Sequence, residues 1–377
     1  MKILTVFGTR PEAIKMAMLI KKLSTEKTIQ HKVCVTAQHR EMLDQVLHFF
    51  SIEPDYDLNI MKQGQNLSSI TGDVLQKITE IYKQYQPDLV IVHGDTTTCF
   101  TATLAAFYLQ IKVAHIEAGM RTFNLQEPFP EEANRVLTAK LATYHFAPTE
   151  KNVQNLLVEG IAKKNIIKTG NTVIDALLYA TKKVKSFSAK TRRTGIEDIF
   201  KKKKKIILVT GHRRENFGSG FIDICNALKT IAEKYHDVEI VYPVHLNPNV
   251  QKPVLELLSD IKNIHLIEPL EYPDFIFAMK NSWIILTDSG GIQEEAPSLG
   301  KPVLVMRNVT ERPEAVKSGT VHLVGTNKNK IVRFVDTLYQ DKNVYKKMSQ
   351  SINPYGDGKA SWRIVQWIKK NKKEILK

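Results

Sequence analysis

The sequence contains little cysteine and no long apolar run. Three cysteines occur in 377 residues, at Cys34, Cys99 and Cys225, and no two of them form a Cys-x-x-Cys pair. This spacing argues against a disulfide scaffold and a thiolate zinc site, and it fits a reducing compartment. No apolar run approaches the roughly 18 residues that a membrane-spanning helix needs. The start of the chain has only a short apolar stretch, so we expect no secretory signal, no membrane insertion and a cytoplasmic location.

Several cofactor and metal motifs are also missing. The sequence has no Gly-x-Gly-x-x-Gly motif, no Gly-x-x-x-x-Gly-Lys-Ser/Thr loop and no His-Glu-x-x-His pair. We therefore expect no nicotinamide or flavin cofactor and no metal site. The histidines are scattered, and most of them are better explained as residues at strand ends than as metal ligands. They include His93, His115, His145, His212 and His245.

Positive charge is abundant, since the formal net charge is +15 at pH 7. A nucleic-acid-binding protein would gather such charge with aromatic residues on one face. Here the densest block, Lys201 to Lys205, directly precedes the apolar run Ile206 to Val209. A solvated lead-in to a strand explains this block better, so we expect no nucleic-acid partner. An anionic small-molecule substrate would also suit a basic protein, although net charge does not identify the anion.

Short apolar runs alternate with longer amphipathic stretches such as Ser68–Gln84 and Glu131–Ala142. This alternation predicts parallel strands that are buried on both faces. The expected strands are Lys2–Phe7, Lys32–Thr36, Asp88–His93, Lys112–Ile116 and Tyr144–Ala147, then Lys205–Thr210, Glu239–Pro243, Ile264–Ile267, Trp283–Thr287 and Pro302–Val305. The fold class is therefore α/β, with two doubly wound, Rossmann-like domains facing each other across a cleft.

The length is comfortable for two domains. We expect the first domain over residues 1–170 and the second over 171–355. The polar, lysine-rich stretch Thr181–Lys204 is a candidate connector, although the hinge could also fall near Thr169-Gly170-Asn171. The tail Gly358–Lys377 has the pattern of a helix, and we expect residues 356–377 to pack back on the first domain.

In such sheets ligands bind beyond the carboxyl ends of the strands, so the residues after each strand are the candidates for chemistry. The first strand is followed by Gly8, which allows a tight turn, and by a predicted helix that carries Arg10 and Lys15. Two cations beside a helix N-terminus favour an anion. A first helix with ordinary surface charge is the alternative.

Three carboxylates follow other strands of the first half. Asp95 comes after one strand, and an N-cap is its structural alternative. Glu117 closes an apolar strand, where a carboxylate is costly unless it is paired; Arg121 is a possible partner. Glu131 opens a helix behind a loop that contains two prolines. Clustered carboxylates push their pKa values apart, which can give one site both an acid and a base.

The second half offers an anion site. His212 follows a strand and a glycine, so it is a candidate diphosphate ligand or acid, with a surface histidine as the alternative. The turn Ser289-Gly290-Gly291 leads into a helix and can present backbone N–H groups to a phosphate. Glu295 lies one turn further on, where it could hold ribose hydroxyls, and Arg312 adds a cation.

With these residues the chain resembles the bacterial non-hydrolysing UDP-N-acetylglucosamine 2-epimerases. The matching stretches run in order through nearly the whole chain, so together they are far more specific than any one motif. One departure is Met120, where the family usually has leucine, and this swap conserves volume. The stretches are Phe7 to Lys15, Ala37 to Arg40, Val92 to Thr96, His115 to Gly119, Pro130 to Arg135, Thr210 to Glu215, Asp288 to Gly291 and Asn353 to Gly358.

The resemblance implies two domains of the glycosyltransferase-B type, a homodimer and no redox cofactor. It also implies interconversion of UDP-GlcNAc and UDP-ManNAc through loss of UDP, a 2-acetamidoglucal intermediate and re-addition of UDP, which supplies ManNAc-type sugars for bacterial surface polysaccharides. The family's catalytic positions match Asp95, Glu117, Glu131 and His212. Its UDP-contacting positions match Arg10, Lys15, His212, Phe275, Ser289, Gly290, Gly291, Glu295 and Arg312.

Many bacterial members are also activated by their own substrate, and the corresponding positions here are Gln38, His39, Arg40 and His245. Because Glu41 stands where some regulated members have glutamine, regulation is a weaker expectation than activity. Three other functions remain open: a hydrolysing relative, a glycosyltransferase of the same fold, and a nucleotide-sugar sensor. The three carboxylates disfavour the last two.

Overall fold

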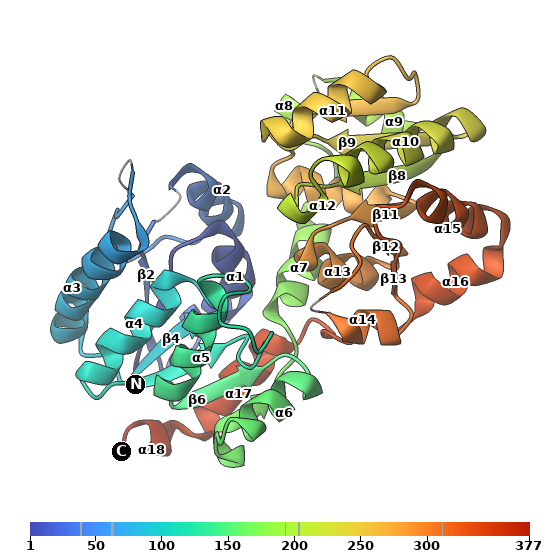
Figure 1. Ribbon diagram of the computed structural model, residues 1–377. Coiled ribbons are helices and arrows are strands. Elements are labelled where there is room, and N and C mark those ends of the chain that lie inside the picture. Colours follow the sequence, from blue (N-terminus) through green and yellow to red (C-terminus); the bar gives the residue numbers. More distant parts are fainter. Residues whose placement is uncertain (38–39, 62–63, 193, 203, 311) are drawn as a thin grey trace. The chain divides into compact units, whose positions relative to one another are not determined.

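The computed structural model describes residues 1–377 apart from 38–39, 62–63, 193, 203 and 311. The chain divides into two compact units. One comprises Met1–Ala176 together with Tyr355–Lys377, and the other comprises Leu177–Pro354. Each unit is built on its own parallel sheet flanked by helices (Figure 1). This confirms the α/β class and the two Rossmann-like domains.

The sheet of the first unit has the strand order β3-β2-β1-β4-β5-β6-β7, and all neighbouring strands are parallel. The strands are β1 (Lys2–Phe7), β2 (Gln30–Val35), β3 (Tyr56–Asp57), β4 (Leu89–His93), β5 (Lys112–Ile116), β6 (Tyr144–Ala147) and β7 (Ile166–Lys168). Every residue of β4 is buried, as are the last four residues of β5. Helices on both faces cause this burial, and it explains why these strands are continuous apolar runs in the sequence.

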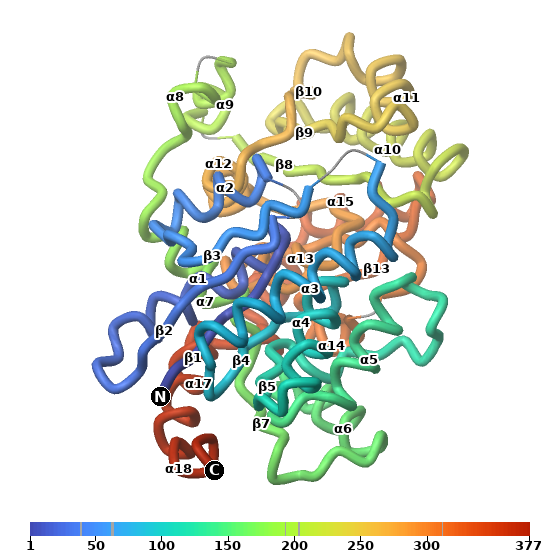
Figure 2. Tube along the Cα trace, turned by 90° about the vertical axis from the view of Figure 1, so that its left-hand side faces the viewer, coloured from blue at the N-terminus to red at the C-terminus, as the bar shows by residue number. Residues whose placement is uncertain are grey.

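Helices α3, α4 and α5 lie side by side on one face of this sheet, and α1, α2 and α17 cover the other (Figures 1 and 2). The helices of the unit are α1 (Arg10–Ser24), α2 (Arg40–Phe50), α3 (Leu67–Tyr85), α4 (Thr97–Tyr108), α5 (Glu131–Leu141), α6 (Glu150–Val158), the 3-10 turn η1 (Lys163–Asn165), α7 (Thr172–Lys183), α17 (Ala360–Lys370) and α18 (Lys372–Ile375). The division between the two units falls within α7.

The C-terminal segment returns to the first unit, where α17 packs beside α1 (Figure 2). The Trp367 ring packs edge-on against Tyr144 and Phe146, with ring centroids 4.8 and 5.4 Å apart. The carboxylate of Asp175 accepts hydrogen bonds from the first backbone N–H groups of α17. The single helix expected over Gly358–Lys377 is interrupted at Asn371, so it forms two helices.

The sheet of the second unit has the order β10-β9-β8-β11-β12-β13 and is also entirely parallel. Its strands are β8 (Lys205–Thr210), β9 (Val238–Pro243), β10 (Ile264–Ile267), β11 (Ile284–Thr287), β12 (Val303–Val305) and β13 (Val321–Leu323). Its helices are α8 (Ala189–Arg192), α9 (Ile196–Lys201), η2 (Arg214–Asn216), α10 (Ser219–Lys234), α11 (Pro248–Leu258), α12 (Tyr272–Asn281), α13 (Gly290–Glu295), η3 (Ala296–Leu299), α14 (Pro313–Lys317), α15 (Lys328–Gln340) and α16 (Lys342–Gln350).

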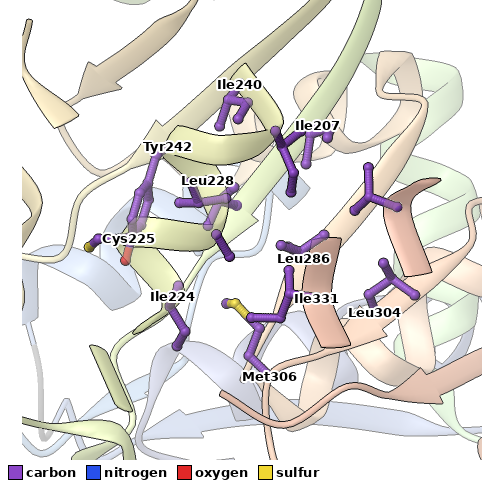
Figure 3. Packing of buried hydrophobic residues seen from close by; sticks show 14 of the residues in the cluster. Ile207, Ile224, Cys225, Leu228, Ile240, Tyr242, Leu286, Leu304, Met306 and Ile331 are labelled. Carbon is purple, nitrogen blue, oxygen red and sulfur yellow. The ribbon is translucent and has the colours of Figure 1, made fainter. Parts of the chain in front are cut away.

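The core of the second unit lies between this sheet and the helices α10, α11 and α15. Figure 3 shows Ile224, Cys225 and Leu228 of α10 packed with sheet residues such as Tyr242 and Leu286. These side chains are fully buried, so the helices and the sheet are held by apolar contact. The rigid sheet that results fixes the positions of the loops beyond its carboxyl edge.

All ten strands expected from the sequence are present, with ends that differ by at most two residues. Three strands were missed, namely β3, β7 and β13, and each has only two or three residues. Such short strands leave no periodic signal in a sequence. The candidate connector Thr181–Lys204 is not a plain linker, because it contains the end of α7 and the helices α8 and α9. Among the helices in the described part of the chain, none has the length and apolarity that crossing a bilayer requires.

Candidate active site

Each sheet has one place where neighbouring strands send their connections to opposite sides. In the first unit this place lies between β1 and β4, and in the second between β8 and β11. Ligands of doubly wound sheets bind beyond the carboxyl ends of such strands. Gly8 and Asp95 follow the first pair of strands, and His212 and Ser289 follow the second pair. The structure therefore places these four residues at the two points.

Close packing requires glycine after β1. A Cβ atom at Gly8 would lie 2.2 Å from Thr36 Oγ1 and 2.6 Å from Thr98 Oγ1. The next residues begin α1, where the carboxylate of Glu12 accepts hydrogen bonds from the backbone N–H groups of Gly8 and Thr9 at 3.0 and 2.8 Å. This capping box fixes the turn that carries Arg10, the first residue of α1.

Glu117 follows β5 and is held by a cluster of polar side chains, the Glu117 cluster, which comprises Glu117, Lys15, His93 and Asn171. The Lys15 ammonium donates to both carboxylate oxygens of Glu117, at 2.7 and 2.6 Å, and Asn171 donates to Oε2 at 3.1 Å. Nε2 of His93 lies 3.4 Å from the same Oε2. The backbone of Glu117 has a φ of 63°, which is rare outside glycine and typical of residues that a site holds in place.

This environment decides the charge of Glu117. Burial raises the pKa of the carboxyl group, but the positive charge of Lys15 and the neighbouring His93 outweigh burial and hold the pKa well below its usual range. Glu117 is therefore ionised near neutral pH. The prediction that Arg121 pairs with Glu117 was wrong. Arg121 instead forms a bidentate ion pair with Glu159, in which Nε and Nη2 donate to Oε1 and Oε2 at 2.5 and 2.8 Å.

Asp95 lies beside Glu117 at the same edge, because β4 and β5 are neighbours and His93 pairs with Ile116. Its Oδ2 accepts a hydrogen bond from Arg135 at 2.6 Å. The alternative role of Asp95 as a helix cap is wrong, since Thr96 caps α4 by accepting from the backbone N–H of Cys99 at 3.1 Å. Asp95 therefore does not cap α4, and Arg135 orients its carboxylate.

The two glutamates that open α5 have different environments. Glu132 is fully buried, and its Oε1 accepts from the backbone N–H groups of Thr122 and Phe123, both at 3.0 Å, which anchors the loop after β5. Glu131 has one buried carboxylate oxygen, Oε2, that makes no hydrogen bond with any residue in the described ranges. A buried carboxylate oxygen without a partner is costly, so its environment differs from that of the anchored Glu132. Because Asn134 and Arg135 of the same helix contact Asp95, the first turn of α5 lies at the edge where Asp95 and Glu117 are found.

In the second unit, His212 lies at the end of β8 beside the buried Asp288 of the β11 end. The Asp288 carboxylate accepts from the backbone N–H groups of His212 and Arg213, both at 2.8 Å. The His212 ring stacks on His245 with ring centroids 5.3 Å apart. Burial lowers the pKa of His212, and the neighbouring His245 and Arg213 lower it further against the opposing effect of Asp288.

The Ser289-Gly290-Gly291 turn begins α13, with Ser289 as its N-cap. The guanidinium of Arg312 lies against this turn: a Cβ atom on Gly290 would be 2.5 Å from Arg312 Nη1. Glu294 of the same helix, which is buried, accepts from Arg312 Nε at 2.6 Å. A fixed cation beside a turn of glycines is suited to an anionic ligand.

The two remaining residues expected to contact UDP also lie beyond strand ends. Glu295 is the half-buried last residue of α13, and Phe275 lies half-buried in the first turn of α12, after β10. Among the described residues, no group of three His, Cys, Asp or Glu side chains is arranged to hold a metal ion.

Comparison with known proteins identifies the family. A family model described as UDP-N-acetylglucosamine 2-epimerase matches residues 21–369. The chain belongs to this family. It is 58% identical over 373 residues to the UDP-N-acetylglucosamine 2-epimerase of Escherichia coli K12, with 99% of both chains covered. The crystal structure of the Neisseria meningitidis UDP-GlcNAc 2-epimerase bound to UDP-GlcNAc has a TM-score of 0.89 and 55% identity, covering 98% of this chain and 100% of that one.

An archaeal structure is similar as well. The Methanocaldococcus jannaschii UDP-GlcNAc 2-epimerase, solved in complex with UDP-GlcNAc and UDP, has a TM-score of 0.80 and 35% identity, covering 98% of this chain and 100% of that one. The resemblance stated from the sequence is thereby confirmed: the protein is an isomerase of the bacterial, non-hydrolysing UDP-N-acetylglucosamine 2-epimerase family.

Of the four residues expected to bind an activating second substrate molecule, the structure describes two, Arg40 and His245. Gln38 and His39 lie outside the described residues. Arg40 begins α2 and forms ion pairs with Asp44 and Asp57. His245 stacks on His212, so it lies beside the candidate nucleotide site of the second unit. Regulation by substrate stays a prediction.

Sequence reasoning missed three residues of the site. His93 was assigned to the scattered histidines, Asn171 to a candidate hinge and Glu12 only to a motif. In the structure, His93 and Asn171 lie next to the Glu117 carboxylate. The Glu12 carboxylate accepts hydrogen bonds from Gly8 in the turn after β1 and from Thr96 in the turn after β4. Only Glu12 carried a local signal, since Thr9 followed by Glu12 has the spacing of a capping box.

Proposed function

We propose that this enzyme interconverts UDP-GlcNAc and UDP-ManNAc without a redox cofactor. The observation that carries the proposal is the meeting of Glu117, Asp95 and the first turn of α5 at one edge of the first sheet, where Lys15 holds Glu117 ionised. An ionised, buried carboxylate beside further carboxylates can serve as a base while another group serves as an acid.

The reaction proposed here begins with removal of the proton from carbon 2 of the sugar by a carboxylate base. The electron pair of that bond forms the carbon 1–carbon 2 double bond, and the bond between carbon 1 and the diphosphate oxygen breaks with its electrons leaving on UDP. This gives 2-acetamidoglucal. UDP then adds back to carbon 1 while a proton is delivered to the opposite face of carbon 2. Asp95, Glu117 and Glu131 together supply the base and the acid.

The second unit holds the nucleotide in this proposal. Arg312 beside the Ser289-Gly290 turn and His212 beside Asp288 bind the diphosphate and stabilise the negative charge of departing UDP. We assign Phe275 to the uracil and Glu295 to the ribose. Arg10 contributes a cation from the start of α1. Lys15, expected to contact UDP, is engaged with Glu117, so its role in this proposal is to set the charge of that carboxylate.

Proton NMR of UDP-GlcNAc with the enzyme in deuterated buffer tests this proposal. We expect UDP-ManNAc to appear with deuterium at carbon 2 and without added NAD or metal. Free ManNAc with an equal amount of UDP would instead indicate the hydrolysing reaction. Binding of UDP-GlcNAc without turnover would indicate a sensor, and sugar transfer to an acceptor would indicate a glycosyltransferase.

We further propose that the enzyme is a homodimer that associates through α4. This helix contains no charged residue, and its Phe107 and Tyr108 are exposed. In a chain with a net charge of +15, a neutral apolar face is where two copies can meet without repulsion. Light scattering should give twice the chain mass for the wild type and one chain mass for Phe107→Glu. A wild-type monomer would contradict this.

We also propose that the protein works in the cytoplasm and supplies ManNAc-type sugars for bacterial surface polysaccharides. Its three cysteines are free and buried, which suits a reducing compartment. Loss of surface polysaccharide on deletion of the gene, restored by active enzyme and not by an inactive Glu117→Gln variant, would support the second part.

A further inference from the structure

One buried histidine of the first unit has no role in the reaction as proposed. His93 is the last residue of β4 and is 3% exposed, and neither of its ring nitrogens has a hydrogen-bond partner among the described residues. Buried polar atoms are nearly always paired, because leaving one unpaired costs free energy. A fold that keeps such a group at a strand end calls for an explanation.

The neighbouring strands offer a contrast. His115 of β5 and His145 of β6 are equally buried, and Nε2 of His115 contacts the Gly94 oxygen at 2.7 Å. Each of these two rings has one buried nitrogen, Nδ1, without a hydrogen-bond partner among the described residues, whereas His93 has two. The contact with Gly94 explains the His115 ring as part of the scaffold. His93 lacks such a contact and faces the charged groups Glu117 and Glu12 instead.

The two oxygens of Glu117 have different surroundings. Oε1 receives the Lys15 ammonium at 2.7 Å. Oε2 receives Lys15 at 2.6 Å and Asn171 at 3.1 Å, and it lies 3.4 Å from Nε2 of His93. The distance to His93 is slightly long for a hydrogen bond, but contacts of catalytic groups commonly tighten when substrate binds. Three side chains therefore lie close to Oε2, whereas among the described residues Lys15 alone donates to Oε1.

We propose that His93 is a positioning residue for the reaction: with Asn171 it anchors Oε2 of Glu117, so that Oε1 is the oxygen that exchanges a proton with carbon 2 of the sugar. The proposal rests on the proposed function, which makes Glu117 an acid–base group. It explains why an imidazole without a scaffold partner lies behind that carboxylate. The charged and titratable groups around His93 and Glu117 are Glu12 and Lys15 on α1 and His115 on β5.

Paired substitutions separate positioning from space filling. In His93→Gln an amide N–H takes the place of Nε2, whereas in His93→Asn the amide reaches only the position of Nδ1. We expect His93→Asn to lower kcat at least tenfold with KM and UDP affinity nearly unchanged, and His93→Gln to recover most of that loss. The matched control is His145→Asn, an equally buried histidine outside the Glu117 cluster, which should keep kcat even if its stability falls.

The pH dependence gives a second readout. Removing His93 takes away a group that favours the ionised form of Glu117, so the acidic limb of kcat/KM should move to higher pH in His93→Asn and return towards the wild type in His93→Gln. Equal kcat values and equal pH profiles for the Asn and Gln variants would overturn the proposal. So would an equal loss of kcat in His145→Asn.

A third readout does not depend on turnover. Carbon-13 NMR of the Glu117 carboxyl, assigned with Glu117→Gln, should show a higher pKa in His93→Asn than in His93→Gln. If the wild-type enzyme exchanged no deuterium into carbon 2, the proposed function would fail while this titration still tested the contact. If the enzyme were active and the titration of Glu117 were the same in both variants, the positioning role of His93 alone would fail.

Discussion

The Asp288 carboxylate lies beside both the backbone and the imidazole of His212. Its Oδ2 accepts the backbone N–H of His212 at 2.8 Å, and its Oδ1 lies 3.5 Å from Nδ1 of the imidazole. Asp288 is fully buried at the end of β11, whereas His212 is partly exposed at the end of β8. Because β8 and β11 pair in the sheet, the rigid core sets both the position of this loop and the direction of its imidazole.

The first prediction concerns this pair. Asp288→Asn keeps an oxygen that can accept the backbone N–H groups but removes the charge that faces His212. We expect kcat to fall roughly tenfold or more, because the negative charge that favours the protonated imidazole of His212 is lost. The control is Asp175→Asn, another buried aspartate that accepts two backbone N–H groups, at the start of α17. Equal losses of kcat in the two variants would mean that Asp288 has only a structural role.

The second prediction tests the carboxylates. Asp95→Asn, Glu117→Gln and Glu131→Gln keep the shape of each side chain and remove its capacity to transfer a proton. We expect each variant to fold and to bind UDP, while kcat falls roughly 10²- to 10⁴-fold. Glu132→Gln is a useful comparison because Glu132 anchors a loop, so its main effect should be on thermal stability. Near wild-type turnover in all three variants would refute the acid–base assignment.

The third prediction concerns space at the phosphate turn. In Gly290→Ala the new methyl group would meet the Arg312 guanidinium at 2.5 Å, so the guanidinium must move away from the turn. We expect UDP affinity, measured by calorimetry, to fall by about tenfold or more. Among the described residues, none outside the local backbone lies within 4 Å of a Cβ atom at Gly291, so Gly291→Ala should weaken binding less. The opposite order would show that Arg312 does not act through this contact.

The fourth prediction removes the guanidinium itself. Arg312→Ala should weaken UDP binding by roughly 1.5–3 kcal/mol, the usual worth of a hydrogen bond to a charged group. Arg333→Ala removes the same charge from the exposed face of α15 and should leave the affinity unchanged. Because Arg312 also contacts the buried Glu294, unfolding should be measured alongside binding. Unchanged UDP affinity in a folded Arg312→Ala protein would make Arg312 a structural cation.

The fifth prediction is a dependence of stability on pH. Burial lowers the pKa of His115 to about 3 and that of His145 to about 4, from an ordinary value of 6.5. As pH falls below 6.5, the unfolded chain binds protons at these histidines and the folded protein does not. The free energy of unfolding should therefore fall between about pH 6.5 and pH 4, by up to about 1.4 kcal/mol per pH unit for each histidine.

Urea unfolding at several pH values measures this slope. His145→Gln removes one of the histidines with a lowered pKa and should make the dependence shallower over this range. His236→Gln, which replaces an exposed histidine, should leave the slope as it is in the wild type. An unchanged slope in His145→Gln would mean that His145 is protonated in the folded protein as readily as in the unfolded chain.

The sequence alone determined the fold class and where the chemistry could lie. Strands such as Lys2–Phe7 and Lys205–Thr210 were predicted to the residue because strands buried on both faces are unbroken apolar runs bounded by glycine. The rule that ligands bind beyond the carboxyl ends of parallel strands then pointed to Asp95, Glu117 and His212 without any knowledge of distances.

Only the tertiary structure decided which side chains pair with which. Glu117 lies 102 residues from Lys15 in the chain, and Asp288 lies 76 residues from His212, so no local pattern could reveal either contact. The sequence suggested the nearby Arg121 as the partner of Glu117, but Arg121 forms its ion pair with Glu159. Pairing across a parallel sheet depends on strand order and register, which the packing of the whole unit sets, whereas apolar periodicity is a property of each segment by itself.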